Sequence, residues 1–216
     1  IRIGLRLSKD ETIVRMPFEV RHMGSKYPIF SFDFTGAKRG VLPASYDYLR
    51  LEGRMQYRLN LPPIGYSQLM LEGGKIFGKV PYLLLKLHEG NGTYFYDRYA
   101  FSCMNFYEFS SDAWISFFYE HHFNGFLLGR VPLLKKLNWR EVFVFKGVYG
   151  TLSARNDGSL PNTKAVMLFP VGMSSVEHPY LETGFGIENI FRLLRVDCIW
   201  RLTHHRAVPG LSIPTF

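Results

Sequence analysis

The most regular pattern in the chain is an alternation of apolar and polar residues with a period of two. Between Leu49 and Leu59 the odd positions are mostly apolar. The even positions are all polar: Arg50, Glu52, Arg54, Gln56 and Arg58. A period of two places alternate side chains on opposite faces of a β-strand, whereas on a helix these charges would be spread around the axis. The segment therefore predicts an amphipathic strand.

The same alternation recurs along most of the sequence. It recurs in residues 1–8, 30–35, 181–188 and 195–202, and less regularly in 115–120, where Phe118 lies among the polar positions; further candidate strands are 13–20, 64–77, 99–109 and 140–152. Together these segments predict about ten strands. No amphipathic helix is predicted; Pro132 favours at most a short helical turn within 130–139. We predict an all-β antiparallel fold in one domain, 1–216, because Pro and Gly are spread evenly and mark no boundary.

Strand length and face composition favour a transmembrane barrel. The segments 46–59, 64–77, 113–123 and 140–152 are long enough to cross the apolar band of an outer membrane when tilted. A lipid-facing Arg or Lys at mid-membrane costs about 2–4 kcal/mol, so the charged face should line the lumen. The predicted lumen-facing residues are Arg50, Glu52, Arg54, Arg58, Glu182, Glu188 and Arg201. We expect Glu52, Glu72, Glu182 and Glu188 to balance Arg50, Arg54 and Arg58.

Aromatic residues near the predicted strand ends resemble the interfacial girdles of such barrels, although β-propensity alone also explains aromatic residues in strands. They are Tyr46, Tyr48, Tyr57, Tyr66, Tyr94, Tyr96, Tyr99, Trp114, Trp139, Tyr149, Tyr180 and Trp200.

Composition excludes several other classes. The chain has 216 residues, a net charge of +8, 47% hydrophobic and 16% aromatic residues, and two cysteines. So much apolar content excludes disorder, two cysteines exclude a disulfide scaffold, and no apolar run is long enough for a spanning helix. Cys103 and Cys198 are each expected on an apolar face.

The connections leave the strand orientation open. Short and long connections alternate, as in a barrel with tight turns at one end. If 60–63 and 110–112 are both tight turns, strict alternation also places the long 153–178 segment at the same end, which is inconsistent with that pattern.

The chain offers little catalytic or metal-binding chemistry. His121 and His122, like His204 and His205, are adjacent, and neighbouring side chains of a strand point to opposite faces, so neither pair should chelate a metal. Residues 72–75 (EGGK) are interpreted as a glycine kink rather than a phosphate loop. We expect no cofactor and no enzymatic activity. A lipid hydrolase would need a serine and a histidine side by side on the outer wall, with Ser67 or Ser116 as the nucleophile.

A basic run could contact an anionic partner: Arg130, Lys135, Lys136, Arg140 and Lys146, with Trp139 among them. Nucleic-acid binding is one interpretation. The favoured one is a solvated turn at a membrane surface, where basic residues meet lipid phosphates.

Several ungapped blocks resemble one family. They are 65–67 (GYS), 74–84 (GKIFGKVPYLL), 121–125 (HHFNG), 130–141 (RVPLLKKLNWRE), 180–191 (YLETGFGIENIF), 195–197 (RVD) and 200–203 (WRLT). The family is a Bacteroidota outer-membrane family of unknown function, which joins a carboxypeptidase-regulatory-like domain to a C-terminal barrel. That barrel is similar to the surface-antigen, outer-membrane assembly factor superfamily.

The resemblance implies an outer-membrane barrel of about sixteen strands. This chain then supplies the C-terminal portion and lacks the N-terminal domain. After Thr203 the sequence departs from the family pattern: 204–216 is too short for a further loop and closing strand, Pro214 removes a ladder donor, and only Phe216 matches a terminal-aromatic signal.

We therefore expect a non-enzymatic outer-membrane β-barrel protein. By superfamily analogy it assists assembly or export of outer-membrane or surface components. Its expected partners are outer-membrane lipid and other outer-membrane or periplasmic proteins, not nucleic acid. The alternatives are a soluble ligand-binding β-barrel or sandwich with an aromatic interior, and a barrel enzyme acting on lipid.

Overall fold

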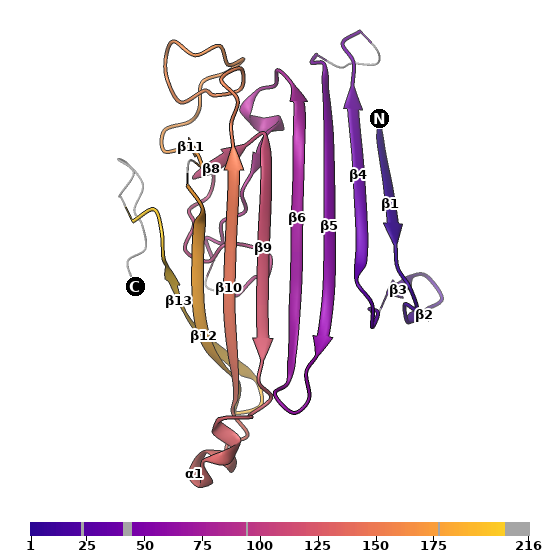
Figure 1. Cartoon of the computed structure of the whole chain (residues 1–216), viewed down its shortest axis with the longest axis vertical. Helices are drawn as coiled ribbons and strands as arrows, with labels where there is room; N and C mark the ends of the chain where they lie inside the picture. The colour runs from indigo at the N-terminus through magenta and orange to yellow at the C-terminus, as the bar shows by residue number, and fades with distance from the viewer. Residues whose placement is uncertain (23, 41–44, 94, 177, 206–216) are drawn as a thin grey trace.

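The chain folds around one antiparallel sheet (Figure 1). The structure, a computed structural model, describes residues 1–216 except 23, 41–44, 94, 177 and 206–216. Each strand of this eight-stranded sheet pairs with its neighbours in the order β1-β4-β5-β6-β9-β10-β12-β13, which is a meander. The strands are β1 (Arg2–Leu7), β4 (Ile29–Ala37), β5 (Tyr48–Asn60), β6 (Tyr66–Gly78), β9 (Ala113–His122), β10 (Arg140–Thr151), β12 (Tyr180–Ile190) and β13 (Leu194–Arg201). The all-β antiparallel class is confirmed, with β1 and β13 at the two edges.

Smaller elements occupy the connections. β2 (Ile13–Arg15) and β3 (Val20–His22) form a hairpin, and β7 (Lys86–Leu87), β8 (Phe109–Ser111) and β11 (Ser174–Ser175) form a second small sheet. The helical turns are η1 (Tyr82–Leu84), η2 (Leu128–Arg130) and α1 (Pro132–Lys135). The short helical turn predicted at Pro132 is confirmed. Within the part of the chain that the structure describes, no helix is long and apolar enough to cross a membrane.

Two predicted strands are wrong. Residues 13–20 form most of the β2–β3 hairpin instead of one strand, and of 99–109 only Phe109 belongs to a strand. Residues 79–112 are instead one long connection between β6 and β9, which we call the inserted segment. The buried side chains Ala100, Phe101, Met104 and Phe109 do not follow a period of two, because this stretch packs on the sheet as an irregular segment and not as a strand.

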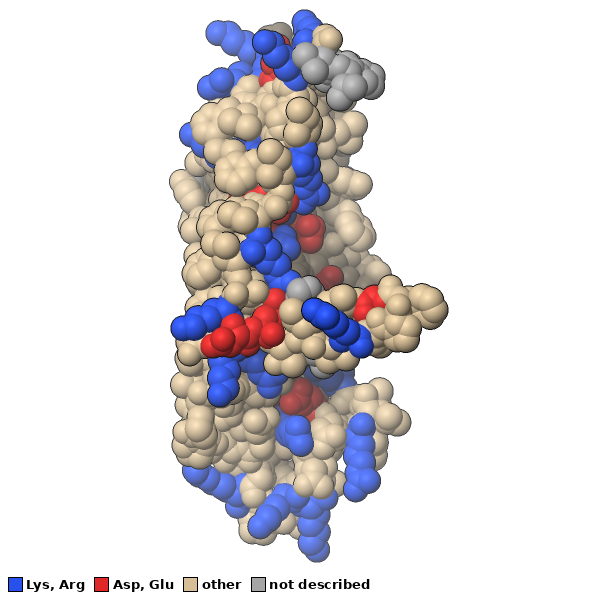
Figure 2. Space-filling model, turned by 90° about the vertical axis from the view of Figure 1, so that its right-hand side faces the viewer, with Lys and Arg blue, Asp and Glu red and all other residues tan. Residues whose placement is uncertain are grey.

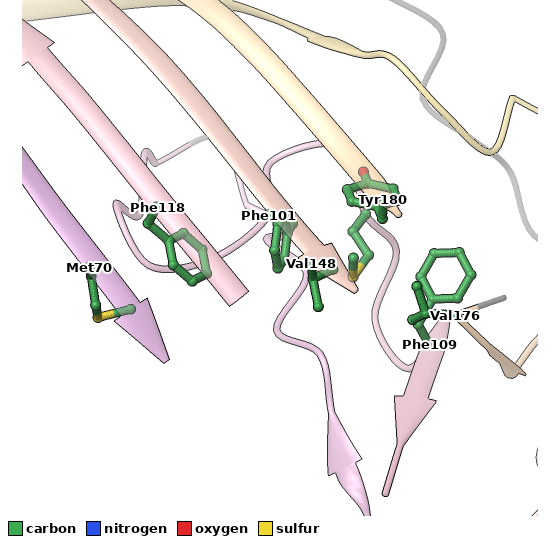
Figure 3. Packing of buried hydrophobic residues seen from close by; sticks show 8 residues of the cluster. Met70, Phe101, Phe109, Phe118, Val148, Val176 and Tyr180 are labelled. Atoms are coloured by element: carbon green, nitrogen blue, oxygen red, sulfur yellow. The ribbon is translucent and has the colours of Figure 1, made fainter. Parts of the chain in front are cut away.

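The inserted segment covers part of one face of the sheet and forms the core with it (Figure 3). Phe101, Met104 and Phe109 of this segment pack against side chains from β6, β9, β10 and β12. The whole cluster is Met70, Phe101, Met104, Phe109, Phe118, Val148, Val176 and Tyr180. The core therefore lies between the sheet and its longest connection.

The two ends of the sheet differ in their connections. At one end lie 8–28, 61–65, 123–139 and 191–193; at the other lie 38–47, 79–112 and 152–179 (Figure 1). The prediction of a tight turn at 110–112 between two long strands is wrong, because these residues end the inserted segment and lead into β9. This removes the conflict over 153–178. The segment 206–216, which contains Pro214 and Phe216, and Tyr94 lie outside the described residues.

Candidate functional site

The register of the sheet sorts its side chains into two faces. Directly paired residues of antiparallel strands share a face, and the chain pairs Ser31 with Arg54, Arg54 with Glu72, and Glu72 with Ser116. Extending this register across the sheet places all seven predicted residues on the face that the inserted segment partly covers. We call this the charged face, and the opposite one the apolar face.

The predicted charges on β5 are paired along the charged face. Arg50 donates a hydrogen bond to Glu52 at 2.7 Å, and Arg54 donates to Glu72 from Nε at 3.1 Å and from Nη2 at 2.7 Å. Lys86 Nζ of the inserted segment also donates to Glu72, at 2.7 Å. Arg58 lies over the ring of Tyr66, 4.2 Å from its centroid.

The predicted carboxylates of β12 have other partners than the β5 arginines. Glu182 accepts hydrogen bonds from the backbone N–H groups of Ser102 and Cys103, at 2.9 and 2.7 Å. Glu188 contacts His122 at 3.1 Å. The expected balance therefore holds for Glu52 and Glu72 and is wrong for Glu182 and Glu188.

Arg201 fixes the inserted segment to β13. Its Nη2 donates to Glu108 Oε1 at 2.6 Å, and both side chains are almost completely buried. The guanidinium also lies 4.8 Å from the centroid of the Tyr180 ring. Burying two charges is favourable only when they are paired and hydrogen-bonded, so this pair requires the inserted segment to be in place.

Lys146 of β10 is the second anchor of the inserted segment. It was predicted to belong to an exposed basic run, but only 1% of it is exposed, so that part of the prediction is wrong. Its Nζ donates to the carbonyls of Ala100 at 2.5 Å and of Asp97 at 2.8 Å. It also lies 4.6 Å from the centroid of the Tyr96 ring. The β10 register explains this placement, because Lys146 pairs with Glu182 on the charged face.

Glu120 is the centre of the densest charge cluster. This buried β9 carboxylate accepts from Tyr96 at 2.6 Å and from Arg195 Nη1 at 2.8 Å. His122 Nε2 lies 2.7 Å from Glu120 Oε1. Arg195 also donates to Asp197, its neighbour on the same face of β13. Burial, together with the Glu120 carboxylate, raises the pKa of the Tyr96 phenol, which keeps it a donor.

Sequence reasoning missed this cluster. The alternation of 115–120 was a signal for Glu120, which the register places on the charged face with the predicted residues. Lys146 had no signal of this kind, because Val142, Val144 and Val148 share its face of β10. Tyr96 carried no such signal, because it belongs to the inserted segment and not to a strand.

Two spaces adjoin these residues. A polar cavity of about 260 Å³ is lined by Arg54, Glu72, Lys86, His88, Tyr99 and Phe118, among others. Burial and the nearby Lys86 lower the pKa of His88 to about 3, so His88 is neutral. A larger, mainly apolar groove of about 810 Å³ follows β13, the last strand of the sheet among the described residues. Cys103 and Cys198 both line this groove as free thiols, and burial beside Glu182 raises the pKa of Cys103 to about 11.

The apolar face is continuous across the sheet. Its apolar side chains are Ile3, Leu5, Leu7, Phe30, Phe32, Phe34, Leu49, Leu51, Met55, Tyr57, Leu59, Leu69, Leu71, Phe77, Ile115, Phe117, Tyr119, Phe143, Phe145, Tyr149, Leu181, Phe185, Ile187, Leu194, Val196, Cys198 and Trp200. Among the described strand residues on this face, only Lys75 and Glu141 carry a formal charge, and they lie near opposite ends.

Some aromatic residues expected in a girdle lie elsewhere. Trp114 and Tyr180 are buried on the charged face, 5% and 0% exposed, and Tyr96 and Tyr99 belong to the inserted segment. Cys198 lies on the apolar face as predicted, whereas Cys103 is not on a strand.

The adjacent histidines do face opposite sides. His122 is stacked on Tyr66 within the charged face, whereas His121 is hydrogen-bonded to Ser67 on the other face. His204 and His205 contact two different backbone carbonyls, those of His178 and Leu202. Within the described ranges, no group of three or more His, Cys, Asp or Glu side chains is placed to hold a metal ion.

Ser67 and His121 form a close pair on the apolar face. Ser67 Oγ lies 2.8 Å from His121 Nδ1 and 3.0 Å from the Tyr119 hydroxyl, and His121 Nε2 lies 3.0 Å from the carbonyl of Ile64. Ser67 and His121 are only 4% and 5% exposed. Ser116, the other predicted nucleophile, lies on the charged face.

The fold and the two sorted faces define an all-β protein built on an amphipathic antiparallel meander. Residues 1–154 match the model of the C-terminal domain of a family of unknown function, DUF5686. The chain therefore belongs to this family. No curated protein matches the sequence.

Proposed function

We propose that the chain forms part of the wall of a Bacteroidota outer-membrane β-barrel and that it acts without catalysis. The observation that carries this proposal is the sorting of the two faces. An apolar belt with described charges only near its ends suits lipid, and the opposite face concentrates the arginines and carboxylates, as a lumen would. A soluble sheet of this kind would need a second layer over the apolar face.

Strand dimensions support the same proposal. β5 and β6 have 13 residues each and β10 has 12. At about 3.3 Å per residue, tilted strands of this length span an apolar band of roughly 25 Å. Closure requires partners for the edges of β1 and β13, in agreement with the larger barrel of about sixteen strands that the family resemblance implies.

The cellular role proposed is assistance to the assembly or export of outer-membrane or surface components, with other outer-membrane or periplasmic proteins as partners. It rests on the resemblance to the assembly-factor superfamily. Depletion of the protein in its host, followed by quantification of surface-exposed proteins, tests it. A general loss of other barrels from the outer membrane supports the role, and an unchanged outer-membrane proteome contradicts it.

Membrane residence is tested by extraction and by matched substitutions. We expect the chain to need detergent, and Leu51→Arg or Met55→Arg to block its membrane assembly, because each places a cation in the apolar belt. Arg54→Gln is the control on the opposite face of the same strand. It should be mild, because Glu72 keeps its bond to Lys86.

A soluble ligand-binding barrel or sandwich predicts that the chain needs no detergent and that Arg54→Gln is the more damaging substitution. If the chain is monodisperse without detergent, or if Arg54→Gln is the damaging change, the membrane proposal is wrong.

A second candidate, lipid-ester hydrolysis, has one observation in its favour, the contact between Ser67 and His121 on the apolar face. In such a step His121 Nδ1 takes the Ser67 hydroxyl proton while Oγ attacks the ester carbonyl carbon. The alcohol leaves with that proton, and water then releases the fatty acid. Fluorophosphonate labelling that is lost in Ser67→Ala and kept in Ser116→Ala supports it; unlabelled wild-type protein excludes it.

A further inference from the structure

The end of the sheet opposite the inserted segment exposes apolar and basic side chains together. Leu133 of α1 is 84% exposed, and Phe191 and Leu193 in the β12–β13 turn are 81% and 89% exposed. Basic residues stand among them, and together we call these residues the basic rim: Leu127, Arg130, Leu133, Lys135, Lys136, Leu137, Arg140, Phe191, Arg192 and Leu193.

Hydrogen bonds and a cation–π contact hold the segments of the basic rim in place. Within the 123–139 connection the Lys135 N–H donates to the carbonyl of Val131 at 2.9 Å, and the Arg130 guanidinium lies 3.9 Å from the centroid of the Phe126 ring. Asn189 Nδ2, at the end of β12 beside the β12–β13 turn, donates to the carbonyl of Asn138 at 2.8 Å, which links the two connections. Two connections far apart in sequence therefore present one surface.

All the charged residues of the basic rim are positive. The sequence contains no Asp or Glu between Glu120 and Glu141, nor from 189 to 196. The Glu141 carboxylate at the margin accepts a hydrogen bond from the backbone N–H of Leu128. Figure 2 shows basic side chains at the lower end of the molecule, where no acidic side chain is visible.

We propose that the basic rim lies in the headgroup layer of the membrane and binds the phosphates of anionic lipids. This inference rests on the proposed membrane location. Exposed leucines flanked by Lys and Arg suit the boundary between acyl chains and headgroups, because the leucines leave water while the cations meet phosphate. Nucleic acid would satisfy the charges but would leave Leu133 and Leu193 in water.

The first test compares two variants of equal charge change. Arg130, Lys135, Lys136 and Arg140 are changed to Gln in the rim variant; Lys38, Lys79, Arg155 and Lys164, exposed residues outside the rim, are changed to Gln in the control. The full chain is reconstituted in phosphatidylcholine bilayers, and association of spin-labelled phosphatidylglycerol is compared with that of spin-labelled phosphatidylcholine.

We expect wild type and control to prefer phosphatidylglycerol and the rim variant to lose this preference by up to about fivefold per removed contact. Inorganic phosphate at matched ionic strength should not displace the lipid, which separates a headgroup from a free-phosphate site. Equal preference in the rim variant and the control, or displacement by inorganic phosphate, would overturn the inference.

The second test measures depth. With Cys103 and Cys198 replaced by Ser, a nitroxide attached through Leu133→Cys should collide more with oxygen than with a water-soluble nickel complex. The opposite ratio contradicts the inference. If the chain does not enter bilayers at all, the proposed function and this inference both fail; if it enters and the rim variant keeps its selectivity, only the inference fails.

Discussion

At the scale of single residues, the buried charges of the charged face determine whether the inserted segment stays in place. Lys146, Arg201 and Glu182 each contact its backbone or side chains at between 2.5 and 3.4 Å. A buried polar group that loses its partner costs about 1–3 kcal/mol, and more when it is charged. The segment should therefore be sensitive to single changes on the sheet beneath it.

The first prediction concerns Lys146. Lys146→Met keeps most of the volume but leaves the carbonyls of Asp97 and Ala100 without this donor. We expect a loss of about 2–4 kcal/mol in unfolding free energy and faster proteolysis within 88–108. Limited proteolysis and thermal unfolding measure both effects. The exposed Lys164→Met is the control, and equal behaviour of the two variants would contradict the anchoring role.

The second prediction concerns His88 and acid. His88 is buried, hydrogen-bonded to Ser111 at 2.9 Å, and its pKa of about 3 lies below the unfolded value of 6.5. Its neutral form is therefore favoured in the folded state, and the stability it contributes is complete above pH 6.5 and lost as pH falls towards 3. We expect His88→Gln to flatten this part of the unfolding profile by several kcal/mol relative to wild type. Parallel profiles of the two proteins would falsify the prediction.

At the scale of elements, a glycine shows how the register accommodates bulky neighbours. A Cβ on Gly74 of β6 would lie 2.5 Å from the Trp114 ring and 2.7 Å from the carbonyl of Leu51. Gly74 therefore makes room for the ring of Trp114, which is buried on β9.

The third prediction follows from this close approach. Gly74→Ala should cost about 1–3 kcal/mol of unfolding free energy, because the tryptophan and the β5 backbone must move apart. Gly36→Ala is the matched control in β4, where a Cβ would make only ordinary contact with Leu49 at 3.8 Å. Chemical denaturation compares the two variants. A Gly74→Ala protein as stable as the control would show that the tryptophan and the β5 backbone move apart without cost, and would contradict the prediction.

The alternation of apolar and polar residues predicted some elements correctly and others not. The alternation around Arg54 and Glu182 predicted β5 and β12 correctly, because in each case a long strand separates apolar from polar residues. It failed around Phe101, because the apolar residues there belong to an irregular segment packed on the sheet, in which neighbours such as Ala100 and Phe101 are both buried. The partners of Glu182 could not be predicted from the sequence either, because they are backbone N–H groups of the inserted segment.

At the scale of the whole molecule, one face of the sheet is apolar and the other carries the charges, so the two faces suit different surroundings. Trp200 lies on the apolar face and is 48% exposed, whereas Trp114 is buried on the charged face. The difference provides a test of the proposed membrane location and of the assignment of the two faces.

The fourth prediction uses these two tryptophans. A Trp114→Phe, Trp139→Phe variant keeps Trp200, and its fluorescence should be quenched by acyl-chain bromines in reconstituted bilayers. A Trp139→Phe, Trp200→Phe variant keeps Trp114, which should be quenched far less. Quenching of Trp114 in preference to Trp200 would invert the assignment of the faces.

The even number of strands in the meander has a topological consequence. Because eight strands alternate in direction, Arg2 and Arg201 lie at the same end of the sheet, with 152–179 and away from α1. If the meander spans a membrane as proposed, the start of β1 and the end of β13 lie in one compartment and α1 lies in the other. An epitope inserted beside α1 would then be accessible to a protease from the side opposite to an epitope placed directly before β1.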